Sequence, residues 1–227
     1  MKRTLILLIL ALSGMASFSV LSKDRAELPE YTVEGLRRIP NPDSLAVVYA
    51  EPGVNLSQYQ RIYLTEPYVA FRKNWERDQY TETRRRVKSR DMERIKGSVR
   101  DLFLEVFTKE LADGGYNLAD GVGEDVLVVK AAILDLDINA PDVRAAGQKA
   151  SFVSNAGSMT LYLELYDSQT GDLLAKALDP KSDHDRTHMQ WQTGPGNKAA
   201  GERMMKPWAV ALREGLDRAH KEIGESQ

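Results

Sequence analysis

The sequence predicts an α+β fold, a two-layer α/β sandwich in which a mostly antiparallel sheet packs against two long helices. Residues 89–112 and 199–223 carry apolar residues at three- and four-residue intervals, as helices with one buried face do. Residues 126–139 and 158–178 are continuously apolar or alternate between apolar and polar residues, as strands do. A striped helix and a half-apolar sheet bury their apolar faces against each other, so these elements predict two layers around one core.

The first predicted strand lies at residues 59–66, which are rich in β-forming side chains. Pro67 ends or interrupts this strand, because proline cannot donate to a sheet ladder, and residues 68–71 can resume it. The helix at residues 89–112 follows. Its expected N-cap is Ser89, and the two glycines after Asp113 are expected to end it.

Residues 126–139 predict a central strand, because their first half is continuously apolar and so fits a strand covered on both faces. Their second half alternates. It places Leu134 and Leu136 on one face and Asp135 and Asp137 on the other.

Residues 158–167 and 172–178 predict a hairpin, with a glycine-containing turn between the two strands. Residues 179–198 are polar and contain proline and glycine, so they predict a loop before the final helix at 199–223. The helix stripe and the sheet face predict one core that contains Leu102, Phe103, Val106, Leu163 and Leu165.

The N-terminus has the pattern of a secretory signal peptide over residues 1–22: Lys2 and Arg3, an apolar run, and then small residues. An uncleaved membrane anchor is the alternative, because residues 4–22 carry no charge. Either reading predicts export to the periplasm or envelope. Residues 23–50 are polar and contain prolines, and we expect an extended lead-in there, followed by a single domain at 51–227.

Composition excludes several kinds of site. The chain has no cysteine, so disulfides, thiolate metal sites, thiol nucleophiles and an acylated cysteine are all excluded. With 31 basic and 33 acidic residues the net charge is −2, and loss of Lys2 and Arg3 with residues 1–22 makes it −4. A mildly acidic body argues against nucleic acid as a partner.

The segment His184-Asp-Arg-Thr-His188 has the four-residue histidine spacing of zinc peptidases. Its flanks lack the apolar helical stripe that would bring both rings to one face, so we expect loop histidines and no zinc site. Asp135-Leu-Asp-Ile-Asn139 resembles the start of a calcium loop, but its spacers are apolar and no glycine follows. The sequence also lacks nucleophile-elbow and phosphate-loop motifs, so we expect no enzyme activity and no cofactor.

Residues 72–100 contain eleven basic and five acidic residues, a local charge of +6 in an acidic body. Such a cluster is usually a solvated face, but it can also contact anionic lipid headgroups or an acidic partner. The candidate contact residues are Arg84, Arg85, Arg86, Lys88 and Arg90.

Three segments carry a resemblance to a known family: Tyr49-Ala-Glu-Pro-Gly-Val-Asn-Leu-Ser-Gln-Tyr-Gln-Arg-Ile62, the hairpin at 157–180, and Lys206-Pro-Trp-Ala-Val-Ala-Leu-Arg213. Over about residues 45–220 the chain resembles proteobacterial envelope proteins that are classed as a domain of unknown function and often described as lipoproteins. The resemblance implies an envelope location and supplies no functional residues. The chain departs from the lipoprotein pattern because it has no cysteine to acylate.

Two functions therefore stay open at the level of sequence. The first is a noncatalytic accessory or interaction domain of a periplasmic or membrane-associated complex, whose protein partner is unidentified. The second is a binding module for an anionic envelope component, which would be phospholipid, lipopolysaccharide or cell-wall polymer.

The leader pattern predicts a mature protein that lacks the first 16 to 22 residues, because signal peptidase cleaves after small residues that follow the apolar run. N-terminal sequencing of the protein extracted from the envelope measures this directly. A sequence that starts at Met1 would instead support the anchor.

Overall fold

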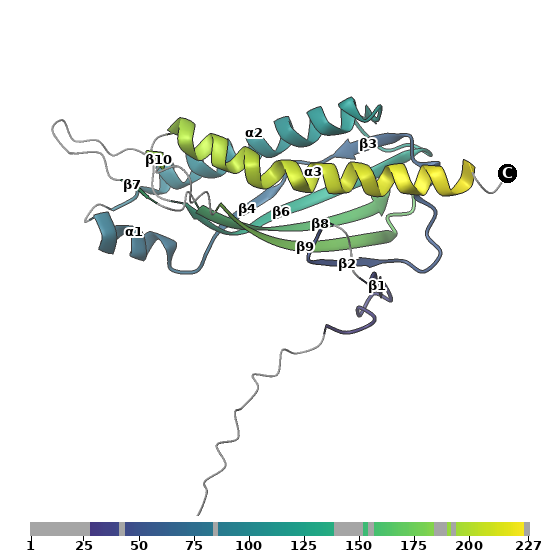
Figure 1. Cartoon of the computed structure of the whole chain (residues 1–227), viewed down its shortest axis with the longest axis horizontal. Helices are drawn as coiled ribbons and strands as arrows, with labels where there is room; N and C mark the ends of the chain where they lie inside the picture. The colour runs from purple at the N-terminus through teal and green to yellow at the C-terminus, as the bar shows by residue number, and fades with distance from the viewer. Residues whose placement is uncertain are drawn as a thin grey trace, which may run out of the picture.

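The computed structural model describes residues 28–40, 44–83, 86–138, 152–153, 157–183, 190–191 and 194–224. The predicted α+β class is confirmed, because these residues form an eight-stranded mixed sheet and three α-helices (Figure 1). A separate pair of two-residue strands, β7 (Phe152–Val153) and β10 (Gln190–Trp191), forms a second small sheet.

The main sheet is antiparallel across most of its width. In spatial order its strands are β1 (Arg37–Arg38), β2 (Val47–Ala50), β9 (Leu173–Asp183), β8 (Gly157–Asp167), β6 (Val126–Ile138), β3 (Arg61–Leu64) and β5 (Asn117–Leu118). β3 pairs in parallel with the first part of β6, and β4 (Tyr68–Phe71) pairs in parallel with its second part. The expected interruption at Pro67 is therefore present, and both pieces lie along one edge of β6.

The helices are α1 (Trp75–Thr83), α2 (Ser89–Asp113) and α3 (Gly194–Gly224), and a short 3-10 helix, η1, spans Leu56–Gln58. Figure 1 shows α2 and α3 side by side on the same side of the sheet, and the two helices contact each other. Gly201 permits this close approach, because a Cβ atom there would lie 2.7 Å from Leu102 Cδ2. No helix in the described part of the chain is long and apolar enough to cross a membrane.

The predicted core is confirmed. Leu102 and Phe103 of α2 are buried in one cluster with Leu163 and Leu165 of β8, and Val106 packs against it. In the neighbouring strand β6, Val129 pairs with Leu165 and is fully buried. Alternate residues of β6 and β8 thus face the helices, as their period of two requires.

The predicted face of Leu134 is wrong, because a β-bulge interrupts β6. The pairing with β8 shifts between Leu134 and Asp137, and Asp135 has a left-handed φ of 50°. Leu134 therefore pairs with Thr160 on the face away from the helices, while Leu136 is buried in the core. A bulge adds one residue to the strand, so every side chain after it changes face.

Several predicted boundaries also differ. β9 continues to Asp183 where we expected a loop. Pro180 lies beyond Leu178, which is the last β9 residue that pairs with β2. At such an unpaired edge a residue without an N–H is tolerated. α3 begins at Gly194 instead of 199. The N-cap of α2 is Lys88, so Ser89 is already helical. Part of the expected lead-in forms β1 and β2 of the main sheet.

Replacing Phe103 by Ala should lower the free energy of unfolding by about 3–5 kcal/mol, because the fully buried ring would leave a cavity. Urea unfolding followed by circular dichroism measures this. Val99→Ala, a smaller change at a partly buried position of the same helix, should lower it by less. A loss below about 1 kcal/mol for Phe103→Ala would contradict the central position of this ring.

Candidate functional site

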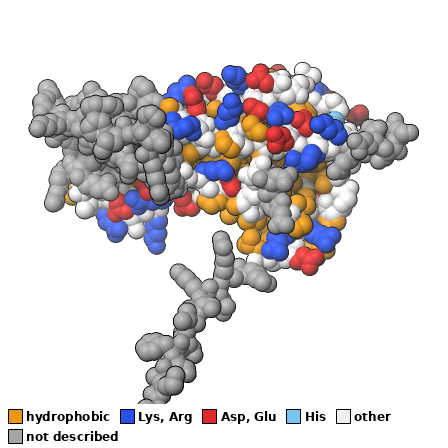
Figure 2. Space-filling model, viewed as in Figure 1, with side chains coloured by type: hydrophobic (Ala, Val, Ile, Leu, Met, Phe, Trp, Pro, Cys, Tyr) orange, Lys and Arg blue, Asp and Glu red, His pale blue; other side chains and the backbone are white. Residues whose placement is uncertain are grey.

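The candidate site is an apolar pocket of about 420 Å³ between α3 and the part of the sheet formed by β2, β9 and β8. Its lining residues are Ile39, Pro40, Ser44, Leu45, Val48, Ala50, Leu56, Leu163, Leu165, Ala175, Lys176, Ala177, Ala211, Leu212, Gly215, Leu216 and Arg218. Figure 2 shows hydrophobic side chains at the surface below the charged face of α3, toward β2 and β9. A volume of this size falls within the range of small-molecule sites.

Small residues on both walls explain why the helix and the sheet do not close this space. Ala175 and Ala177 of β9 face the helices, because they pair with Leu165 and Leu163 of β8. On the opposite wall, α3 contributes Ala211 and Gly215. Close packing normally fills the gap between a helix and a sheet with large side chains, and here these positions provide few side-chain atoms.

A buried carboxylate holds α3 on the sheet just before the pocket. Asp179 of β9 is 4% exposed and accepts a hydrogen bond of 2.7 Å from Trp208 Nε1 of α3. It also accepts one of 2.7 Å from the backbone N–H of Ala46, and Lys181 Nζ lies 3.1 Å away. These contacts join α3, β9 and the segment before β2, because a buried carboxylate needs partners for its lone pairs.

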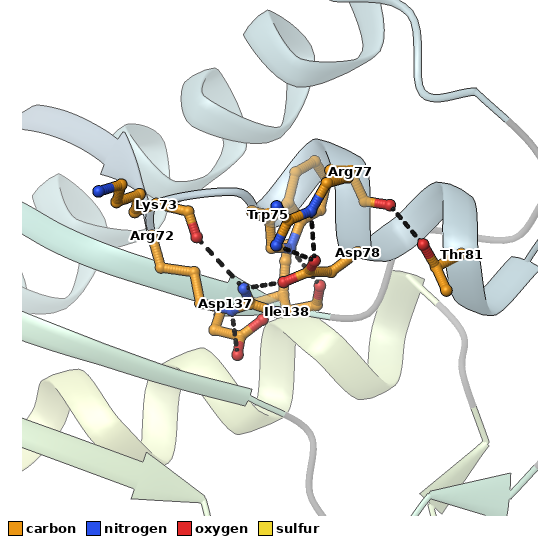
Figure 3. A network of polar contacts seen from close by, with 8 residues as sticks. All are labelled: Arg72, Lys73, Trp75, Arg77, Asp78, Thr81, Asp137 and Ile138. Carbon is orange, nitrogen blue, oxygen red and sulfur yellow. Dashed lines mark hydrogen bonds and ion pairs between the residues drawn. The ribbon is translucent and has the colours of Figure 1, made fainter.

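A second polar network fastens α1 to the end of β6 (Figure 3). The Arg72 guanidinium lies 2.6 Å from a carboxylate oxygen of Asp78 and 2.6 Å from one of Asp137. The hydrogen bond that Arg72 donates to Asp78, and then the one that it donates to Asp137, raises the pKa of Arg72 above its usual value. Trp75 Nε1 donates to the Ile138 carbonyl at 2.8 Å. The Asp137 carboxylate thus pairs with Arg72 and helps to hold α1 against β6.

The structure describes three of the five basic residues that the sequence singled out. Arg86, Lys88 and Arg90 are exposed at the start of α2, and they make no ion pair with any described residue. Arg84 and Arg85 lie outside the described residues. Other cations of the segment are neutralised: Arg94 pairs with Asp91, Lys96 with Glu93, and Arg100 with Glu66.

The two segments that resemble metal-binding motifs, at which we expected no metal, lie only partly within the described chain. His184, His188 and Asn139 lie outside it. Among the described residues, no group of three or more histidine or acidic side chains could hold a metal ion. His220 contacts the Leu216 carbonyl and Gln60, and its ring packs edge-on against Tyr116.

The face of the sheet turned away from the helices carries a tyrosine cluster on β8. Tyr162 and Tyr166 both donate to the Glu164 carboxylate, at 2.5 and 2.8 Å. Lys130 Nζ lies 4.4 Å from the centre of the Tyr166 ring. Burial, and then the neighbouring Glu164, raises the pKa of Tyr166 to about 12. Both tyrosine hydroxyls thus have an acceptor within the cluster, and these contacts order the side chains of this face.

Sequence comparison assigns the chain to a family. A model described as "Protein of unknown function (DUF3313)" matches residues 32–209, which is most of the chain. The chain belongs to the DUF3313 family. This confirms the expected class of a domain of unknown function. No curated protein matches the chain.

Solved structures resemble this DUF3313 chain only at low similarity. A DUF330 protein from Xanthomonas campestris is 10% identical with a TM-score of 0.41, and the match covers 78% of this chain and 93% of that one. A PelC dodecamer from Paraburkholderia phytofirmans is 10% identical with a TM-score of 0.34, over 70% of this chain and 96% of that one. At TM-scores below 0.5, these likenesses carry no argument about function.

Sequence reasoning missed the pocket and found only two of its walls. The predicted core contains Leu163 and Leu165, and the predicted helix at residues 199–223 contains the α3 wall of the pocket. The alanines of β9 were visible in the sequence. Their position opposite Gly215 depends on the register of α3 over the sheet, which no local pattern encodes.

The raised pKa of Tyr166 predicts a pH dependence of stability. Its folded pKa of about 12 exceeds the ordinary value of about 10, so the unfolded chain loses this proton first. The free energy of unfolding should therefore hold below pH 10 and fall as pH rises from about 10 to 12. Urea unfolding at several pH values should show a shallower fall for Tyr166→Phe. The control Tyr68→Phe, at an exposed ring, should retain the fall, and equal slopes in wild type and Tyr166→Phe would contradict the prediction.

Proposed function

We propose that this chain is a noncatalytic, exported domain of the cell envelope that acts by binding, as an accessory or interaction protein of a periplasmic or membrane-associated complex. The observation that carries the proposal is the apolar pocket between α3 and the sheet. Its lining offers hydrophobic contacts and few polar groups, which suits recognition better than proton transfer or nucleophilic attack.

The polar clusters support the same function, because each has a structural role within the chain. Asp179 binds α3 to β9, and Arg72 binds α1 to β6. Glu164 accepts both neighbouring tyrosine hydroxyls. The expected two-layer arrangement belongs to this proposal as well: α2 and α3 form one layer, and the pocket opens where α3 borders the sheet.

Export is proposed from the leader pattern of residues 1–22, and the periplasm or the envelope is the compartment it implies. Affinity capture of the mature chain from its native envelope, with identification of both proteins and lipids, tests the function. We expect a protein or lipid enriched in stoichiometric amount over an unrelated exported domain that carries the same tag. The same background set for both baits would overturn the proposal.

The alternative function is contact with an anionic envelope component through the basic start of α2. It is favoured by the exposure of Arg86, Lys88 and Arg90, which make no ion pair with the residues that the structure describes. Guanidinium groups match phosphate and carboxylate geometry, so Arg84, Arg85 and Arg86 are the residues to test.

Changing Arg84, Arg85 and Arg86 together to Ser should weaken binding to anionic phospholipid vesicles, and most at low salt, because salt screens exposed charges. Vesicle co-sedimentation at several salt concentrations measures this. Changing exposed Lys109, Lys206 and Lys221 to Ser removes the same charge elsewhere and should have a smaller effect. Equal binding of the arginine variant and the wild type at every salt concentration would reduce the cluster to a solvated face.

A further inference from the structure

We infer that the border of the domain formed by residues 28–39 lies on the surface of a phospholipid bilayer, with the side chain of Val33 inserted among the lipids. We call this segment the N-terminal hairpin, because its two arms meet at the bridge between Tyr31 and Arg37. The inference rests on the proposed envelope function and adds a membrane contact to it.

The N-terminal hairpin concentrates exposed apolar side chains. Nine large apolar side chains are exposed among the described residues, and four of these nine lie in the hairpin: Leu28, Tyr31, Val33 and Ile39. Single exposed apolar residues are normal on a soluble protein, whereas a group of them marks a contact with another molecule or with lipid. Tyr31 combines an apolar ring with a polar hydroxyl, as side chains at a membrane–water interface do.

A well-defined turn presents Val33 at the tip of the hairpin. The Gly35 N–H donates to the Thr32 carbonyl at 3.0 Å, and the Leu36 N–H donates to the Thr32 hydroxyl oxygen at 3.2 Å. Turns favour glycine, proline, asparagine, aspartate and serine, for reasons of backbone geometry and local hydrogen bonding. Here the turn carries a valine whose side chain is fully exposed. The fold gains no burial from this side chain, which fits an apolar contact outside the chain.

The hairpin is fixed to the domain, so its tip keeps one orientation. Leu36 is buried, and the Tyr49 hydroxyl of β2 donates to the Pro29 carbonyl at 2.9 Å. Lys176 Nζ of β9 lies 2.8 Å from a carboxylate oxygen of Glu34. Figure 1 shows β1 at the border of the molecule opposite α2. A bilayer accommodates an apolar tip at such a border without a matching cavity, which a folded protein partner would have to provide.

The position of the hairpin in the chain favours lipid over a protein partner. As a leader before cleavage, or as an anchor, the uncharged segment 4–22 would hold the chain at the bilayer. Residues 23–27 can separate this segment from the hairpin by at most about 20 Å. Cleavage after residue 16 to 22 leaves the hairpin in the mature chain, so the contact can persist after export.

The hairpin does not require an anionic lipid, because its charges balance. It contains two acidic and two basic residues. Glu30 lies 3.5 Å from Arg37, and Glu34 binds Lys176. Phosphatidylcholine vesicles, which are zwitterionic, therefore separate this contact from electrostatic binding through the basic start of α2.

A single fluorophore tests the contact, because the chain has no cysteine and one introduced cysteine takes one label. In the mature chain, Val33→Cys labelled with nitrobenzoxadiazole should brighten and shift to shorter wavelength when phosphatidylcholine vesicles are added. Val122→Cys is the matched control, since this valine is also exposed but lies outside the hairpin. Its label should not respond. Changing Arg84, Arg85 and Arg86 to Ser should leave the Val33 response unchanged.

Vesicle co-sedimentation measures the energetic share of the tip. Val33→Asp should weaken binding to phosphatidylcholine vesicles by about tenfold, because a carboxylate is costly to move into lipid. Val122→Asp should bind as the wild type does. Both side chains are exposed, so the midpoint of thermal unfolding should be the same in the two variants as in the wild type.

Equal responses of the two labels, or wild-type vesicle binding by Val33→Asp, would overturn the bilayer contact. A label at Val33 that responds to a captured envelope protein and not to vesicles would assign the hairpin to a protein partner, and would overturn it as well. In that case the proposed function stands, because its own test is capture of an envelope component. A vesicle response at Val33 with only background capture would support the contact and remove the proposed function.

Discussion

The hydrogen bond between Trp208 and Asp179 is the contact on which the position of α3 depends. The indole N–H and the carboxylate are both buried, so each would lose solvation without a partner if the helix slid along the sheet. The same carboxylate accepts from the Ala46 N–H, which fixes the segment leading into β2. One side chain thereby sets the distance between two walls of the pocket, and the alanines of β9 and Gly215 of α3 determine how much space remains between them.

Several polar side chains elsewhere in the described chain bind one another. Arg72 pairs with both Asp78 and Asp137. Each carboxylate oxygen of Glu164 accepts a hydrogen bond from one tyrosine hydroxyl. Arg213 of α3 reaches Glu110 of α2 at 2.8 Å. Each group holds one element to another or orders one face, whereas the pocket holds nothing together and leaves apolar surface accessible. This contrast is the basis of the binding function that we propose.

The spacing of apolar residues and the positions of proline and glycine predicted most of the elements. The stripe of α2, the alternation of β8 and the break at Pro67 all appear where those local rules place them. α1 was not predicted, because Trp75 is its main buried residue and no stripe repeats along it. The bulge at Asp135 was not predicted either, since an alternating segment reads the same with or without one extra residue in the ladder.

The candidate site was less predictable than the fold for a related reason. Its walls come from α3, three strands and the segment around Ile39, and only tertiary packing brings these together. The basic cluster, by contrast, was visible as a run of charge, but the sequence could not tell which of its members find acids nearby. Arg100 pairs with Glu66, which is far from it in the chain, while Lys88 and Arg90 stay exposed.

The two ends of the strand order in the main sheet, β1 and β5, affect how readily the sheet pairs with another chain. Each is only two residues long, and β1 consists of Arg37 and Arg38. A short or cationic border presents few backbone donors and acceptors to another chain, so it is a poor template for edge-to-edge aggregation. These two strands therefore offer little backbone for pairing with the sheet of another molecule.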